Sequence, residues 1–317
     1  MSNTTETYQT KQYGGICIGV GGIKGILQSG AIHEFWVRGQ LKNLTYYSGS
    51  SAGGMIAALL CIGYEPIDLL TSLCTPDFAN QMNSNLNFMN LPTIYGLYPN
   101  SIIRKKIEQM FMLKLGYLPT FLDIKNKLHK FLTIPIYCIS EKEIKNRKIY
   151  CSPVTTPDMQ VVDAIVLTCS IPLVFQKAVY KDKVYIDGAY TSTFPIQALQ
   201  DVCPIECPIL GICIKDEEIN LDSFIGYSSA ILTIPLQEQH NLCNMYSDID
   251  VIEIQADSSV SAFNFNLSVR EKIHMFNFGV KQVKDLLSSR ESDQVKKLTN
   301  KKEVVDVQPI EVKEKKE

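Results

Sequence analysis

Short apolar runs alternate with segments of helical periodicity from the start of the chain. Residues 14–20 (GGICIGV) are an apolar run closed by glycines, which predicts a buried strand, and residues 22–38 carry apolar side chains at helical spacing. Residues 44–49 and 52–62 repeat the order of strand and helix. Two strand–helix units within the first part of the chain predict an α/β fold with a mainly parallel central sheet.

The rest of the chain continues this mixture. Further strands are expected at 131–140, 148–152, 183–190, 208–214 and 250–256, the first two as a hairpin. Further helices are expected over most of 66–130, around an Asn- and Pro-rich loop at 79–100, and at 160–170 and 267–287. The end of the chain is charged and poor in aromatic residues. We therefore expect a flexible N-terminus (1–13), one domain (14–288) and a disordered tail (289–317).

Composition narrows the classes of function. The net charge of −2 over 317 residues provides no basic field for nucleic acid. The N-terminal MSNTTETYQTKQ lacks the apolar core of a secretory signal, and the uncharged segment 43–64 is apolar only over GMIAALLCI, too short to cross a bilayer. The ten cysteines are scattered without a CxxC pair, which does not indicate a metal site. A cytoplasmic protein without metal or cofactor is the expectation.

One five-residue segment has the pattern of a nucleophile elbow. Gly49-Ser50-Ser51-Ala52-Gly53 fits G-x-S-x-G in a single frame, between a predicted strand and an Ala-rich helix. A sharp turn in that position lifts a serine hydroxyl out of the sheet, and the helix N-terminus favours the negative charge of an acyl-transfer intermediate. Ser51 is therefore the candidate nucleophile. The alternative is an ordinary Gly/Ser turn between a strand and a helix.

Two other segments supply the remaining groups of such a site. Gly19–Gly25 follows the first strand, but Lys24 breaks the dinucleotide-binding G-x-G-x-x-G pattern and no P-loop G-K-[ST] follows. The adjacent N–H groups of Gly21 and Gly22 at a helix start suit an oxyanion hole, although a tight turn would have the same residues. Asp187 ends the predicted strand KVYID and is followed by Gly188. It is a candidate base, with an Asx turn as the alternative.

These three segments, in this order, resemble the patatin-like phospholipase family over about residues 15–285. The resemblance implies a three-layer α/β/α sandwich and a lipid acyl hydrolase of the phospholipase A type, with Ser51 and Asp187 as a catalytic dyad and Gly21 and Gly22 as the oxyanion hole. The family's supporting motif positions correspond to Lys24, Gly25, Gly49, Gly53 and Gly188. One departure is Val20, where the family usually has glycine. A β-branched residue disfavours positive φ, so a distorted oxyanion hole is one consequence to test.

In the family the aspartate takes the serine proton directly. An aspartate of ordinary pKa is a weak base, so desolvation and direct contact have to compensate. The rival arrangement is an α/β-hydrolase triad with His240 or His274 as base. A transacylase, an esterase for soluble substrates, and a catalytically inactive lipid-binding protein on the same scaffold are also compatible with these motifs.

The expected partner is a phospholipid or another fatty-acyl ester, and a homodimer remains open. Segment 76–115 also suggests transient contact with a membrane surface, because apolar residues precede three consecutive cations. The apolar residues are Phe88, Met89, Leu91, Ile94, Tyr95, Leu97 and Tyr98, and the cations are Arg104, Lys105 and Lys106. The alternative for this segment is a core-facing lid with one solvated helix face.

Overall fold

The computed structural model describes residues 11–75, 89, 91–204, 206–215, 249–256, 262 and 264–305, with side chains as far as 293. Its strands are β1 (Gly15–Ile18), β2 (Tyr46–Gly49), β3 (Gly96–Tyr98), β4 (Phe131–Cys138), β5 (Lys148–Cys151), β6 (Leu173–Phe175), β7 (Ala178–Tyr180), β8 (Lys183–Ile186), β9 (Ile209–Ile214) and β10 (Asp250–Ile254). Its α-helices are α1 (Gly25–Val37), α2 (Ala52–Cys61), α3 (Pro66–Leu73), α5 (Leu91–Ile94), α6 (Ser101–Leu115), α7 (Phe121–Leu128), α8 (Val161–Thr168), α9 (Ile196–Gln200) and α11 (Val269–Val305). Short 3₁₀ turns are η1 (Gly22–Lys24), η3 (Ile144–Asn146) and η4 (Gly188–Tyr190).

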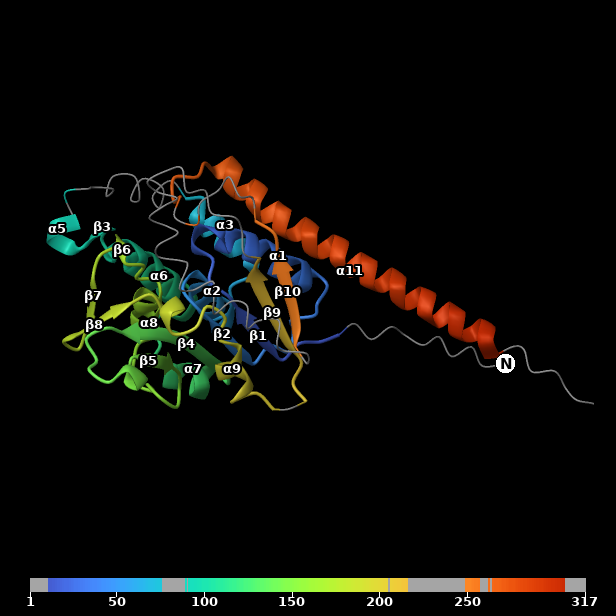
Figure 1. Ribbon diagram of the computed structural model, residues 1–317, viewed down its shortest axis with the longest axis horizontal. Helices are drawn as coiled ribbons and strands as arrows, with labels where there is room; N and C mark the ends of the chain where they lie inside the picture. The colour runs from blue at the N-terminus through green and yellow to red at the C-terminus, as the bar shows by residue number, and fades with distance from the viewer. Residues whose placement is uncertain are drawn as a thin grey trace, which may run out of the picture.

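A mixed sheet with the strand order β10-β9-β1-β2-β4-β8-β7 runs through the molecule (Figure 1). The strands from β10 to β4 are parallel, whereas β5 and β8 pair with β4 in the antiparallel sense, as does β7 with β8. The mainly parallel sheet and the β4–β5 hairpin are therefore confirmed. Ile18 of β1 pairs with Gly49 of β2, so the two glycine-containing turns begin side by side at one edge of the sheet.

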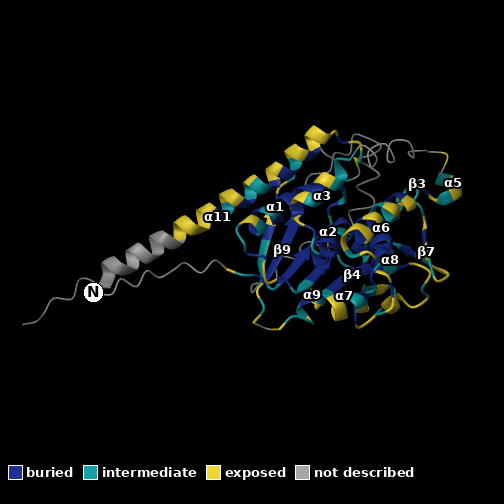
Figure 2. Cartoon of the chain, turned by 180° about the vertical axis from the view of Figure 1, so that it is seen from behind, coloured by how far each residue is buried: buried dark blue, intermediate teal, exposed yellow. Residues whose placement is uncertain are grey.

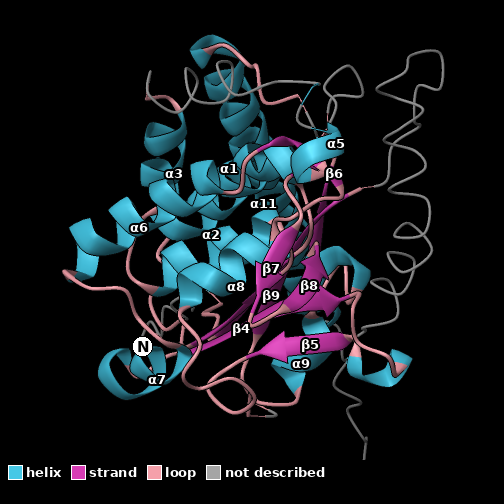
Figure 3. Cartoon of the chain, turned by 90° about the vertical axis from the view of Figure 1, so that its left-hand side faces the viewer, coloured by secondary structure: helices cyan, strands magenta, loops and turns pink. Residues whose placement is uncertain are grey.

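Most of the described helices cover one face of this sheet, as Figure 3 shows from the side. The short helix α9 lies on the other face, where Cys17 of β1 packs in a small cluster with Phe194 and Leu199. The large core includes Ile16 and Ile18 of β1 together with the inner faces of α1, α2 and α8. The central strands β1, β2, β4 and β9 are almost completely buried, as the dark blue of the sheet in Figure 2 shows, which fits their nearly continuous apolar sequences. No helix in the described part of the chain is both long and apolar enough to span a bilayer.

Both predicted ends of the domain need adjustment. Tyr13, assigned to the flexible segment 1–13, is buried, packs edge-on against Phe35 and donates a hydrogen bond to Asp250. At the other end α11 runs to Val305 instead of ending at 287, because this segment is rich in Lys, Arg, Glu and Gln, which favour a helix, and no proline follows Val269 until Pro309. Residues 1–10 and 306–317 lie outside the described residues.

The start of the predicted tail is attached to the domain. Arg290 donates to Asp250 at 2.9 Å and Glu291 accepts from Arg38 at 2.7 Å, which ties this part of α11 to β10 and to the end of α1. These pairs join segments far apart in the sequence, and such long-range contacts are not visible in the local charge pattern.

Candidate active site

The candidate nucleophile lies on a sharp turn between β2 and α2. Ser51 precedes α2 with φ 53° and ψ −126°, a conformation that is rare for a non-glycine residue and costs about 1–3 kcal/mol. Gly49 ends β2. Gly53 lets the turn pass close to the first glycine loop, because a Cβ there would lie 2.3 Å from the carbonyl oxygen of Gly19. This is the backbone geometry that the G-x-S-x-G pattern predicts.

The turn brings the Ser51 hydroxyl into contact with the aspartate predicted to be its partner. Ser51 Oγ donates a hydrogen bond of 2.7 Å to Asp187 Oδ2, across 136 residues of sequence. Asp187 follows β8, which pairs with β4 close to the end of that strand. Its other oxygen, Oδ1, accepts the N–H of Ala189 at 2.8 Å. The hydrogen bond from Ala189 to Oδ1 therefore holds the carboxylate so that Oδ2 faces the Ser51 hydroxyl.

Burial changes the proton affinity of this carboxylate. Asp187 is almost completely removed from solvent, and desolvation raises its pKa to about 7. The hydrogen bonds from Ala189 and Ser51 favour the ionised form and act in the opposite direction, but they are the smaller causes. An aspartate with such a pKa is a far better proton acceptor near neutral pH than an ordinary one.

Thr168, at the end of α8, links the two chain segments and is not identified by the sequence pattern. Its Oγ1 accepts the backbone N–H of Ser51 at 3.1 Å. The same oxygen lies against Gly188, where an added Cβ would be 2.2 Å away. A threonine near a helix end carries no local signal of this role, because both of its partners are distant in sequence.

The Gly19–Gly25 segment forms the turn between β1 and α1, and its geometry depends on Gly22. Gly22 has φ +53°, and a Cβ there would lie 2.3 Å from the carbonyl oxygen of Ala262. Within the described part of the chain, the N–H groups of Gly21 and Gly22 donate to no backbone carbonyl. Gly22 lines the same pocket as Ser51, together with Gly25, whereas Gly21 is not among the lining residues and Lys24 is buried in the turn.

A buried glutamine, also not identified by the sequence pattern, supports this turn from α1. Gln28 is completely buried, and its Nε2 donates to the carbonyl oxygens of Gly19 at 3.0 Å and Val20 at 3.4 Å. Its Oε1 lies close to Gly21 and accepts no hydrogen bond from a described residue. Gln28 thus fixes the carbonyls on one side of the loop whose N–H groups are the candidate oxyanion donors.

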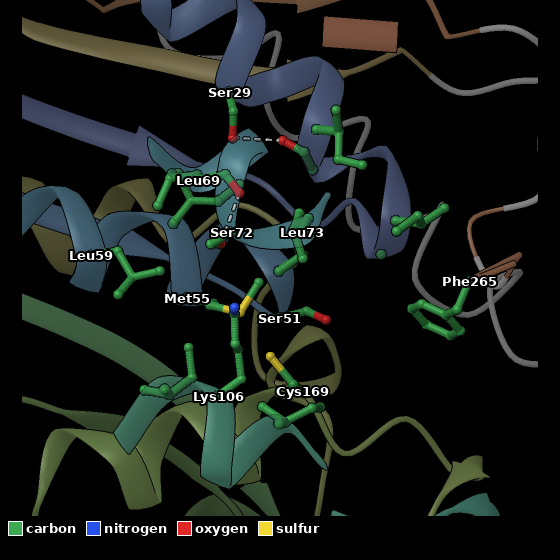
Figure 4. A pocket seen from close by; sticks show the side chains of 18 of the residues that line it. Ser29, Ser51, Met55, Leu59, Leu69, Ser72, Leu73, Lys106, Cys169 and Phe265 are labelled. Carbon is green, nitrogen blue, oxygen red and sulfur yellow. Dashed lines mark hydrogen bonds between the residues drawn. The ribbon is translucent and has the colours of Figure 1, made fainter. Parts of the chain in front are cut away.

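An apolar pocket opens beside Ser51, between α1, α2, α3 and α6. Its empty volume is about 920 Å³, which includes the open space at its mouth. Figure 4 shows Ser51, Met55 and Cys169 around the same space, with Lys106 reaching in from α6 and Phe265 at one side. Apart from Lys106, the described lining carries no charged side chain. The pocket suits a hydrocarbon chain whose end lies at Ser51.

The family model for the patatin-like phospholipases matches residues 16–199, which is more than half of the chain and contains both Ser51 and Asp187. The chain belongs to the patatin-like phospholipase family.

Individual relatives are distant but extend over most of the chain. A probable lipid hydrolase, 463L, from Invertebrate iridescent virus 6 is 26% identical over 85% of this chain and 87% of its own length. The uncharacterized protein R571 of Acanthamoeba polyphaga mimivirus is 23% identical over 89% and 96%. Among solved structures, VipD from Legionella pneumophila superposes with a TM-score of 0.51 at 16% identity, covering 88% of this chain and 67% of VipD, which is a likeness of fold.

The departure from the family pattern at Val20 is accommodated without strain. Val20 does not adopt positive φ, and Gly22 is the one residue of the patatin glycine turn that does. The N–H of Val20 donates to the carbonyl oxygen of Thr193 at 3.0 Å. Val20 therefore does not need the positive φ that a β-branched side chain disfavours.

No histidine in the described part of the patatin domain lines the pocket. His274 is exposed on α11, and His33 packs against Phe276. His129 ends α7. His240 lies outside the described residues. The Ser51 hydroxyl is instead directed to Asp187.

Proposed function

We propose that the chain is a lipid acyl hydrolase of the phospholipase A type that works through a Ser51 acyl-enzyme. The observation that carries this proposal is the 2.7 Å hydrogen bond from Ser51 Oγ to a buried carboxylate whose pKa is raised to about 7 by desolvation. Membership of the patatin-like phospholipases and a relative named as a probable lipid hydrolase support the lipid substrate.

In the proposed reaction Ser51 Oγ attacks the carbonyl carbon of a fatty-acyl ester while its proton passes to Asp187 Oδ2. The N–H groups of Gly21 and Gly22 stabilise the negative charge that develops on the carbonyl oxygen. Asp187 then gives the proton to the departing alcohol, and the acyl group remains on Ser51. A water molecule, deprotonated by Asp187, attacks the acyl-enzyme, and Asp187 returns that proton to Ser51 Oγ as the fatty acid leaves.

The strained conformation of Ser51 supports its role as a nucleophile. A non-glycine residue at positive φ costs folding free energy, and such costs are retained where the geometry serves a site. The apolar lining of the neighbouring pocket, including Met55, Leu59 and Ile107, supports an acyl chain as the occupant. These contacts favour long hydrocarbon chains over small polar acyl groups.

The test is release of fatty acid from mixed phospholipid vesicles, combined with covalent labelling by a fluorophosphonate probe. We expect Ser51→Ala to abolish both, and Asp187→Asn to lower the rate of release by at least about a thousandfold, the size of effect typical for loss of a catalytic base. Release of fatty acid by the Ser51→Ala protein would refute the proposal.

Ser50→Ala is the matched control. Ser50 is the neighbouring residue, fully buried, and its hydroxyl has no hydrogen-bond partner among the described residues. Its loss therefore removes one hydroxyl from the same turn without touching Asp187. If the folded wild-type protein is not labelled by the fluorophosphonate probe, the chain is instead a catalytically inactive lipid-binding protein on the same scaffold.

A further inference from the structure

One end of the molecule exposes several large apolar side chains together. Tyr95, Leu173 and Val179 are 54%, 57% and 58% exposed, and we call these three residues with Lys177 the apolar lip. Tyr95 follows α5, Leu173 begins β6 and Val179 lies in β7, and these elements lie at one end of the molecule in Figure 1. Met89, just before α5, is more exposed still.

The lip is held in place by paired backbone. Gly96 of β3 pairs with Leu173 of β6, and Lys177 N–H donates to the carbonyl oxygen of Ile94 at 3.0 Å. Both Tyr95 and Leu173 have positive φ, 61° and 65°. Glycine or asparagine would adopt this conformation at lower cost. Two residues thus combine backbone strain with an exposed apolar side chain, which points to a use for the side chains themselves.

The charges around the lip sum to a small positive excess. Residues 89–98 contain no charged residue, and residues 171–180 contain Lys177 alone. The Lys177 ammonium lies 4.5 Å from the centre of the Tyr95 ring. In the following turn Lys181 accompanies Asp182, and Lys183 is paired with Glu141 at 2.7 Å. The described surface is therefore apolar with a small excess of positive charge.

The lip is continuous with the pocket beside Ser51. Ile171 and Phe175, which flank Leu173 in sequence, line that pocket. Phe175 packs behind the lip with Ile102, Tyr98 and Phe265. Apolar side chains thus connect the lip with the pocket.

Two of the three cations expected beside this surface make contacts elsewhere. Arg104 pairs with Asp163 and Glu108, and Lys106 lines the pocket, which leaves Lys105 as the exposed member of the three. Lys177 supplies the charge at the lip instead.

We propose that the apolar lip docks on an anionic lipid bilayer and that an acyl chain leaves the bilayer there to enter the pocket. Leu173 and Val179 insert among the acyl chains, Tyr95 lies at the interface, and Lys177 contacts anionic headgroups. This inference rests on the proposed function, since it supplies the route by which a membrane lipid reaches Ser51.

The experiment measures vesicle binding of the full chain carrying Ser51→Ala, so that no hydrolysis takes place. Flotation is compared between phosphatidylcholine vesicles and vesicles with about a third phosphatidylserine. We expect binding to the anionic vesicles, a fall of about tenfold with Tyr95→Asn and Leu173→Asn combined, and a fall of about fivefold with Lys177→Gln. Asparagine suits positive φ, and thermal unfolding shows whether each variant is folded.

Leu113→Gln is the matched control, because Leu113 is 82% exposed near the far end of α6 and should leave binding unchanged. Three results would overturn the inference: no binding by the parent, equal binding by the lip variants, or a dimer in light scattering that the lip variants dissociate. Lys177→Gln, at an exposed position, keeps the test valid if the double variant does not fold. Hydrolysis of a soluble p-nitrophenyl ester by the wild-type chain tests the chemistry separately, without a bilayer.

Discussion

Replacing Asp187 by asparagine should stabilise the fold while it removes activity. The carboxylate is buried, and its pKa rises from an ordinary 3.8 to about 7 in the folded chain. Between these values the folded state binds a proton that the unfolded chain does not, so folding stability falls as pH rises. Above pH 7 Asp187 is ionised in the folded protein, so the full desolvation free energy of its buried charge opposes folding. Asparagine has nearly the same shape and carries no charge at any pH.

The size of the effect follows from the two pKa values. A pKa of 3.8 in the unfolded chain and about 7 in the folded chain correspond, at about 1.4 kcal/mol per pKa unit, to roughly 4 kcal/mol lost above pH 7. Asparagine can still accept the Ala189 N–H through its carbonyl oxygen and donate to Ser51 through its amide. We expect the variant to melt about 5–8 °C higher than wild type near pH 8.5, with little difference near pH 4.

Thermal unfolding measured across this pH range tests the reasoning. Asp201→Asn, at an exposed aspartate on the end of α9, is the control for loss of one negative charge. The decisive quantity is the difference in melting temperature between Asp187→Asn and wild type, which should grow from about pH 4 to pH 7 and then level off. A difference that is independent of pH, or a less stable variant at pH 8.5, would show that desolvation of Asp187 does not limit stability.

Three further predictions concern the same site. Because Asp187 must be ionised to accept the Ser51 proton, kcat/KM should fall about tenfold per pH unit below its pKa of about 7 and level off above it; a flat profile down to about pH 5 would contradict this assignment. Thr168→Val removes the acceptor of the Ser51 N–H, which should lower kcat about tenfold with little change in KM, whereas Thr168→Ser should restore it. Gln28→Met removes both hydrogen bonds to the glycine turn and should lower kcat more than KM; Gln28→Glu, which also lacks the donor, should not restore it, and normal kcat in both variants would exclude a positioning role.

The sequence is most informative where a local pattern has a local cause. The apolar runs at β1 and β2 and the glycines after them predict buried strands followed by tight turns, and the structure confirms that arrangement. The G-x-S-x-G pattern predicts a strained strand-to-helix turn, and Ser51 adopts positive φ there. The prediction of Asp187 as the base rests on its place after a strand and on the family resemblance. The hydrogen bond between Asp187 and Ser51 joins residues far apart in the sequence and is visible only in the folded chain.

Other features depend on contacts that no local pattern encodes. Thr168 and Gln28 are ordinary residues within their helices, and their importance lies in hydrogen bonds to Ser51 and to the glycine turn. The three-residue strands β3 and β6 are too short to produce a recognisable alternation and are fixed by pairing with each other. The extension of α11 to Val305 is not predicted, because a charged segment without aromatic residues has the composition of a solvated tail.

Two energetically unfavourable features meet at the site. Ser51 is held in a strained conformation, and Asp187 carries a charge that its surroundings disfavour. Either alone would destabilise the fold without benefit, but their hydrogen bond joins the buried Ser51 hydroxyl, the proposed nucleophile, to a carboxylate whose raised pKa would make it an effective base. Thr168 joins the two segments by accepting the Ser51 N–H while it packs against Gly188. In the proposed mechanism proton transfer does not need a histidine, since burial of the Asp187 carboxylate provides the base strength that an imidazole would otherwise bring.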